Sequence, residues 1–178
     1  AFIGGGNMAR SIIGGLLHQG FDKSRLHVSE PHAPTREALA HELAIEVCED
    51  NLQAAGNGSV WLFAVKPQVM KSVCTPLREL AQKQRPLILS IAAGITAGQL
   101  DSWLGGGLPV IRIMPNTPAL LGAGASGLYA NAVVDENQKR ITEHLFQATG
   151  LCKWIEDESL MDTVTALSGS GPAYVFLL

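Results

Sequence analysis

The sequence has few of the features that mark secreted, membrane-bound or metal-binding chains. Its three cysteines, Cys48, Cys74 and Cys152, are odd in number and far apart, so they predict neither a disulfide framework nor a metal knuckle. A reduced, cytoplasmic setting is the expectation. No apolar stretch approaches the roughly 20 residues that span a bilayer, and no charged leader precedes a cleavable apolar segment.

Charge of either sign is also scarce. Lys and Arg total 13 and Asp and Glu total 16, which gives a net charge of −3, and no basic run or stripe is present. We therefore expect neither a nucleic acid nor a membrane as partner. The five histidines show no paired ligand spacing, so no metal site is expected. No Ser-His-Asp or Cys-His arrangement is supported, although hydrophobic residues at 47% suffice for a buried core.

Glycine is abundant, and its most informative use is near the start of the chain. Gly4, Gly6 and Ala9 form a G-x-G-x-x-A turn between an apolar stretch and an amphipathic segment with Met8, Ile12 and Leu16. In a dinucleotide fingerprint the first glycine makes a tight turn, the second admits a pyrophosphate and the third small residue packs the helix on the strand. The turn therefore predicts nucleotide binding, with a merely flexible turn as the alternative.

Short apolar runs alternate with helical patterns along the chain, which predicts βαβ units and a mostly parallel, doubly wound Rossmann-type sheet. Strands are expected at 26–29, 45–47, 60–65, 87–90, 110–114, 125–129 and 151–154, besides the first. Helices are expected at 35–43, 96–104 and 135–148, the last two with capping-box spacing, and a short turn or helix is expected at 51–55. Pro76 predicts a helix that is interrupted and restarts with Thr75 as its cap.

Strand signals cease after residue 158, and 160–178 resembles the first helices of a separate α-helical unit. We therefore expect a dinucleotide-binding domain at 1–157 and the beginning of a C-terminal helical domain at 158–178. Ala1 lies inside a strand pattern and Leu178 ends an apolar helical pattern without a stop signal. These ends predict a fragment, with a few residues lost in front and a substantial part missing behind.

Ligands of open parallel sheets bind beyond the carboxyl ends of the strands, so the residues that follow each strand are the candidates. Glu30 lies about 20 residues beyond the glycine turn, where a carboxylate would bind the ribose hydroxyls and favour NAD over NADP. A surface carboxylate is the alternative. Arg36 could serve a 2′-phosphate or be a solvated helix residue, and Lys66 would position a ligand at the mouth of the cleft.

The later strand ends carry three further motifs. Ala92-Ala93-Gly94 offers small residues beside which a flat ring could lie, or a tight turn. Met114-Pro115-Asn116-Thr117-Pro118 is a rigid loop that suits a binding wall, or a structural turn. Ser168-Gly169-Ser170-Gly171-Pro172 predicts either an anion-facing helix start with a proline at its first position, or a hinge between domains.

Five segments together carry a family resemblance over essentially the whole chain. In order and spacing the chain resembles pyrroline-5-carboxylate reductase at Phe2 to Ala9, Ala64-Val65-Lys66-Pro67-Gln68, Ala92-Ala93-Gly94, Arg112 to Pro118 and Ala166 to Tyr174. The resemblance implies hydride transfer from NADPH or NADH to the C=N bond of 1-pyrroline-5-carboxylate, the last step of proline biosynthesis. It also implies a Rossmann domain followed by an all-helical domain that forms homodimers or larger homo-oligomers.

Carried over by position, the resemblance implies cofactor contacts at Ile3, Gly4, Gly5, Gly6, Asn7, Met8, Ser29, Glu30, Asn51, Ala64, Val65, Lys66, Pro67, Ile91, Ala92 and Ala93. Substrate-side residues would be Asn116, Thr117, Ser170 and Gly171. Many relatives have a neutral side chain where Glu30 stands, so its carboxylate argues against a 2′-phosphate. The family's substrate-carboxylate loop would lie beyond Leu178, and no catalytic acid is expected among these residues.

Three alternatives remain open. The glycine turn also suits a deazaflavin-dependent NADP oxidoreductase or a β-hydroxyacid dehydrogenase, although the latter would need a catalytic lysine on the last helix, which has none up to Leu178. A nucleotide-sensing or scaffold protein could keep the same fold without chemistry.

Overall fold

The computed structural model describes residues 1–171, apart from the side chains of Leu120, Leu121 and Ser170. Eight strands form one sheet in the order β3-β2-β1-β4-β5-β6-β7-β8. All neighbouring pairs are parallel except β6 and β7, which are antiparallel. The expected Rossmann-type, mostly parallel sheet is thereby confirmed. The strands are β1 (Phe2–Ile3), β2 (Val28–Ser29), β3 (Val47–Cys48), β4 (Val60–Phe63), β5 (Leu87–Ser90), β6 (Val110–Met114), β7 (Gly124–Ala130) and β8 (Gly150–Trp154).

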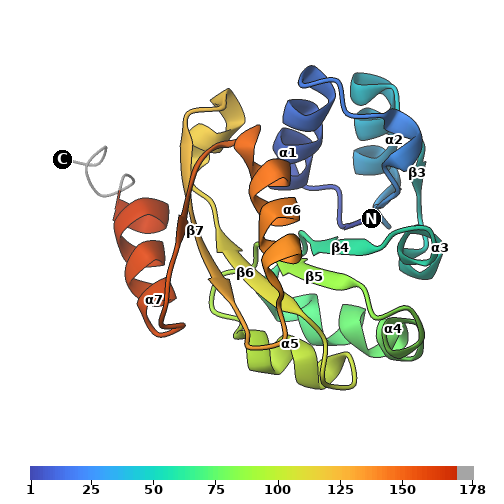
Figure 1. Cartoon of the computed structure of the whole chain (residues 1–178). Helices are drawn as coiled ribbons and strands as arrows, with labels where there is room; N and C mark the ends of the chain where they lie inside the picture. The colour runs from blue at the N-terminus through green and yellow to red at the C-terminus, as the bar shows by residue number, and fades with distance from the viewer. Residues whose placement is uncertain (172–178) are drawn as a thin grey trace.

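Helices cover both faces of this sheet (Figure 1). They are α1 (Asn7–His18), α2 (Ala33–Leu43), α3 (Asn51–Gly56), α4 (Met70–Gln84), α5 (Ala97–Trp103), α6 (Glu136–Gln147) and α7 (Leu160–Val164). Short 3₁₀ segments lie at η1 (Lys23–Arg25), η2 (Pro67–Val69) and η3 (Thr117–Leu121), and α7 continues into the π-helical η4 (Thr165–Ser170). Among the described residues no helix is long and apolar enough to cross a membrane.

Two hydrophobic clusters lie on opposite faces of the sheet. One joins α1, α2 and α6 to the sheet through side chains that include Ile12, Leu39 and Phe146. The other joins α3, α4 and α5 and includes the fully buried Trp61 and Leu77. A strand that is covered on both faces must be apolar throughout, which is why β4 and β5 consist almost entirely of large apolar residues.

The predicted break in α4 is wrong. The helix runs from Met70 to Gln84 with Pro76 inside it. Its continuous apolar stripe, Met70, Cys74, Leu77 and Ala81, is fully buried against the sheet. Burial of four such side chains outweighs the one backbone hydrogen bond that a proline removes.

Both predicted capping boxes are confirmed. Thr96 accepts a hydrogen bond from the N–H of Gln99, whose side chain accepts one from the N–H of Thr96, and Asp135 and Gln138 pair in the same way. These reciprocal bonds satisfy backbone donors that a helix start otherwise leaves free. They fix the starts of α5 and α6 at the predicted places.

Candidate functional site

The carboxyl ends of the parallel strands form one row. Ile3 of β1 is in register with Ser29 of β2 and with Phe63 of β4, and Phe63 is in register with Ser90 of β5. The residue after each strand therefore lies at the same edge of the sheet. This register brings together the predicted cofactor residues at 3–8, 29–30, 64–67 and 91–93, which are far apart in the sequence.

Gly4 makes the sharp turn out of β1. Its φ is +101°, in the left-handed region, and a Cβ there would lie 2.8 Å from the carbonyl oxygen of Ala64 and 2.9 Å from Cγ1 of Val65. Only glycine fits both the conformation and the space. The turn is thus closely packed against the end of β4.

The space around Gly6 is open, whereas the space around Gly4 is filled by the end of β4. Apart from its two chain neighbours, no protein atom lies within 4 Å of the position of a Cβ on Gly6, the N-cap of α1, which has an ordinary φ of −68°. The first turn of α1 has no side-chain cap and no acidic residue, and Ala9 is fully buried at the third fingerprint position. Free N–H groups, the positive end of the helix dipole and an open approach suit a bound pyrophosphate. The residues present therefore fit a dinucleotide.

Glu30 follows β2 and holds the glycine turn directly. Its Oε2 accepts a hydrogen bond of 2.9 Å from the N–H of Gly5, and its Oε1 accepts one of 2.9 Å from the N–H of His32. A carboxylate has about four lone-pair sites, so both oxygens keep capacity for another donor. The carboxylate therefore stands beside the turn in a fixed orientation.

Arg36 braces the backbone of the same corner. Its NH1 donates to the carbonyl oxygens of Glu30 at 2.9 Å and Pro31 at 3.1 Å, and its NH2 lies 3.6 Å from the carboxylate of Glu49. The guanidinium thus serves the loop after β2. The sequence suggested two roles for Arg36, a solvated helix residue or a ligand of the 2′-phosphate. Neither included these hydrogen bonds to the loop after β2.

The ends of β2, β4 and β5 hold the other candidate residues. Ser29 Oγ donates to Oδ1 of Asn51 at 2.7 Å, which ties β2 to the start of α3. Lys66 is exposed and lies three residues beyond the end of β4. Ala92 donates its backbone N–H to Ser90 Oγ at 3.3 Å, within a tight turn after β5.

The predicted substrate side lies around the end of β6. Asn116 uses its Oδ1 to accept a 2.9 Å hydrogen bond from the N–H of Ala125, so this amide shapes the turn between β6 and β7. A Cβ on Gly169 would lie 2.7 Å from Cε of Met114, the last residue of β6. The structure thus brings Asn116 and the Gly169 segment to the same strand end. Thr117, the next residue, begins η3.

The structure describes the Ser168–Pro172 motif only as far as Gly171, and Pro172, the predicted first residue of the helix, lies outside the described residues. Helical structure is continuous from Leu160 to Gly171, so Ser170 and Gly171 lie within a helical run. Met161 is buried and Thr165 Oγ1 donates to the carbonyl oxygen of Met161, which anchors this run upstream of the glycines. The N–H of Gly171 is bonded to the carbonyl oxygen of Ala166 within this run, so it is not free to bind an anion.

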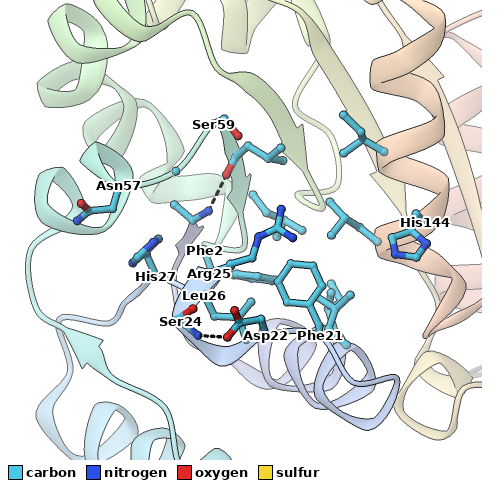
Figure 2. A pocket seen from close by; sticks show the side chains of 18 of the residues that line it. Phe2, Phe21, Asp22, Ser24, Arg25, Leu26, His27, Asn57, Ser59 and His144 are labelled. Carbon is cyan, nitrogen blue, oxygen red and sulfur yellow. Dashed lines mark hydrogen bonds between the residues drawn. The ribbon is translucent and has the colours of Figure 1, made fainter.

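A cavity of about 830 Å³ lies at the opposite end of the sheet (Figure 2). It is lined by the starts of β1 and β4 and by residues that include Phe21, Arg25, His27 and His144. Ser24 donates its N–H to Asp22 at this rim, and that hydrogen bond lowers the pKa of the Asp22 carboxyl. Because ligands of such sheets bind at the carboxyl ends, this cavity is not the candidate site. The described residues contain no group of three metal-ligating side chains.

The fold, the aligned strand ends and the glycine turn define a Rossmann-type α/β protein. Comparison with known proteins then gives the family. The family described as NADP oxidoreductase coenzyme F420-dependent matches residues 1–94. The chain belongs to this family. Its matched residues contain β1 to β5 and most of the candidate site.

Individual relatives and solved structures carry more specific names than the family does. The chain is 52% identical over 178 residues to the pyrroline-5-carboxylate reductase of Pseudomonas aeruginosa, covering all of this chain and 65% of that protein. A solved pyrroline-5-carboxylate reductase from Coxiella burnetii is 41% identical with a TM-score of 0.94, over 99% of this chain and 65% of that one. The Plasmodium falciparum pyrroline carboxylate reductase with NADP bound is 28% identical with a TM-score of 0.84, over 99% and 64%.

These comparisons confirm the resemblance to pyrroline-5-carboxylate reductases. The chain spans 65% of the length of the Pseudomonas protein and 65% of the Coxiella one.

Proposed function

We propose that the row of strand ends binds NADH or NADPH. The first turn of α1 would hold the diphosphate, with Gly6 open toward it, and Glu30 would hold the adenosine ribose. The remaining contacts would come from residues at the same edge, namely Ile3, Gly4, Gly5, Asn7, Met8, Ser29, Asn51, Ala64, Val65, Lys66, Pro67, Ile91, Ala92 and Ala93. Their support is the aligned register of β1, β2, β4 and β5.

The proposed activity is reduction of the C=N bond of 1-pyrroline-5-carboxylate to L-proline. The observation that carries it is the 52% identity over the whole chain to a pyrroline-5-carboxylate reductase. The bound nicotinamide would supply the hydride. The protonated imine accepts hydride at its carbon and becomes a neutral amine, so the proton arrives with the substrate. The chain's own residues then need only bind and orient, which agrees with a site built from backbone and small side chains.

Glu30 bears on which nucleotide is preferred. Its carboxylate is fixed by Gly5 and His32, and a 2′-phosphate on the ribose would bring a second negative charge beside it. Arg36, the neighbouring cation, is engaged with two backbone carbonyls and Glu49. We therefore propose that the protein favours NADH or uses both nucleotides.

The proposed division into domains depends on where the sheet ends. We propose a dinucleotide-binding domain at 1–157 and the start of a helical domain at 158–178, supported by the end of the sheet at Trp154 and the helical run from Leu160. Asn116, Thr117, Ser170 and Gly171 would lie on the substrate side. Assembly into a homodimer or larger homo-oligomer and a cytoplasmic location, suggested by three unpaired cysteines, stay predictions.

The activity is tested with the full-length protein. NADH and NADPH oxidation is followed at 340 nm, with and without 1-pyrroline-5-carboxylate, and the product is identified as proline by mass spectrometry. Oxidation that requires the imine and yields proline supports the proposal. Nucleotide binding without turnover of the imine contradicts it and favours the nucleotide-sensing alternative.

The family's description favours one other candidate, transfer of hydride between NADP and a deazaflavin. The same preparation is therefore assayed with the deazaflavin coenzyme and NADPH. Reduction of the deazaflavin without any activity on the imine would replace the proposed function by this one. A 3-hydroxy acid is assayed in parallel because a β-hydroxyacid dehydrogenase is the other alternative.

A further inference from the structure

One oxygen atom joins three separate elements beside the candidate site. Oε1 of Glu158, in the turn between β8 and α7, lies 2.7 Å from NH1 of Arg112 on β6. The same oxygen accepts a 2.7 Å hydrogen bond from the N–H of Ala97, the first residue of α5. The connection before α7 is thus tied both to the sheet and to a helix 61 residues earlier in the chain.

Arg112 is buried with Glu158 as its charged partner. Its side chain is only 6% exposed within a strand whose remaining residues are apolar, and a buried guanidinium requires a paired acceptor. Glu158 supplies that acceptor from a side chain that is 25% exposed. The carboxylate also satisfies one of the N–H groups that the start of α5 leaves free, beyond the one bound by Thr96.

The helical run that follows Glu158 is packed directly on β6 and β7. A Cβ on Gly127 would lie 3.0 Å from Cγ1 of Val164, and a Cβ on Gly169 would lie 2.7 Å from Cε of Met114. Met114 and Gly127 are register partners in the antiparallel pair of β6 and β7. Because Gly127 and Gly169 have no side chains, the helical run can approach the sheet closely. Met161, in the same run, is buried.

This arrangement places the run at the functional end of the sheet. Arg112 is in register with Ser90, the last residue of β5, so the ion pair lies level with the row of strand ends. Beyond it, Gly169 meets Met114 at the carboxyl end of β6. The direction in which the chain leaves the sheet at Glu158 therefore determines where residues 168–171 lie.

We propose that Arg112 and Glu158 are positioning residues that form a latch between the sheet and the helical run 160–171. The latch holds residues 168–171 at the carboxyl end of β6, where the imine would be bound if the proposed function holds. A charged pair suits this task because it accepts one geometry, whereas an apolar contact of the same size tolerates sliding. Neither side chain is expected to touch the cofactor or the substrate.

The latch itself is tested by hydrogen exchange on the full-length protein without any ligand. Arg112→Met should speed exchange of amides in 160–171 by roughly tenfold or more, because local opening no longer breaks the ion pair. Peptides from α1 should stay within about twofold of wild type. Arg112→Lys, which keeps the charge, should restore part of the protection. Arg10→Met is the matched control and should leave the exchange of 160–171 unchanged, since Arg10 on α1 forms a 2.8 Å pair with Glu42 on α2, and neither helix carries a residue of the latch.

Two exchange results would overturn the proposal. Unchanged protection of 160–171 in Arg112→Met would show that the ion pair does not hold the run. An equal rise in every peptide would show general destabilisation instead of a local role.

The functional consequence is tested by steady-state kinetics and rests on the proposed function. Arg112→Met and Glu158→Gln should raise the KM for 1-pyrroline-5-carboxylate by roughly fivefold or more, with the Kd for the nucleotide within about twofold of wild type. Equal losses of nucleotide and imine binding would contradict a positioning role. If the wild-type protein does not reduce the imine, the proposed function fails, and the exchange experiment still decides whether the latch exists.

Discussion

The backbone N–H of Gly5 donates a 2.9 Å hydrogen bond to Oε2 of Glu30, so the middle of the glycine turn is held by the residue that follows β2. A Cβ on Gly5 would lie 3.1 Å from Cβ of Glu30 and 2.9 Å from Cδ2 of Leu39. The glycine turn, the end of β2 and helix α2 are therefore closely packed against one another. The Glu30 carboxylate, which we expect to bind the ribose, is thus held in place by the glycine turn, which we expect to bind the diphosphate.

Replacing Glu30 should change the nucleotide preference. In Glu30→Ser the negative charge next to the expected 2′ position is lost, and we expect the ratio of kcat/KM for NADPH over NADH to rise by about tenfold or more, equivalent to roughly 1.4 kcal/mol. The control is Glu49→Ser, which removes an exposed carboxylate that pairs with Arg36 at the same corner. An unchanged ratio in Glu30→Ser would remove this side chain from the adenosine site.

Gly4 should matter for folding. Gly4→Ala places a Cβ at a φ of +101° and 2.8 Å from the Ala64 carbonyl oxygen, so we expect a loss of about 2–4 kcal/mol in the free energy of unfolding, measured by urea titration. Gly20→Ala is the matched control, because Gly20 also has a positive φ, +84°, but open space around it. It should cost only about 1–2 kcal/mol. Equal costs would show that the close contact with Ala64 contributes nothing.

Cys74 should be chemically inert in the folded protein. Burial against the sheet raises the pKa of its thiol to about 12, so the reactive thiolate is almost absent at pH 8. A thiol reagent added to native protein should leave Cys74 unmodified, as read by mass spectrometry of peptides, and should modify it after unfolding in urea. Rapid native modification would contradict the buried face assigned to α4.

The same shift has a defined pH consequence. In the unfolded chain the thiol titrates near its ordinary value of 9.0, whereas in the folded protein it stays protonated up to about 12. The unfolded state therefore binds fewer protons between these values, and stability falls as the pH rises through that window. Replacing Cys74 by Ala should remove this part of the alkaline dependence while lowering stability at neutral pH.

Local signals predicted much of the fold. The capping boxes at Thr96 and Asp135 fixed two helix starts, and the apolar runs of β5 and β6 gave their bounds, because both signals depend on neighbouring residues only. The predicted break at Pro76 failed because the burial of the α4 face depends on distant strands. Such tertiary packing is invisible to a rule about single residues.

The candidate site was predicted in part. The glycine turn and the strand ends came from spacing, since parallel strands align their carboxyl ends. The contacts of Glu30 with Gly5, and of Arg112 with Glu158, could not be read from spacing because they join residues 25 and 46 positions apart. One signal pointed toward the second pair: Arg112 is a lone charge in an otherwise apolar strand, and such a residue requires a partner.

The central claim is that the first turn of α1 binds the diphosphate of a nicotinamide dinucleotide, and Gly6→Ala tests it most directly. Apart from its chain neighbours, the new Cβ meets no protein atom within 4 Å, and φ is an ordinary −68°, so the melting temperature should stay close to wild type. The control is Gly98→Ala, at another glycine with open space, located in α5. Titration of NADH and NADPH by fluorescence should show affinity lowered by about tenfold or more in Gly6→Ala and unchanged in Gly98→Ala. Wild-type affinity in Gly6→Ala would contradict the account.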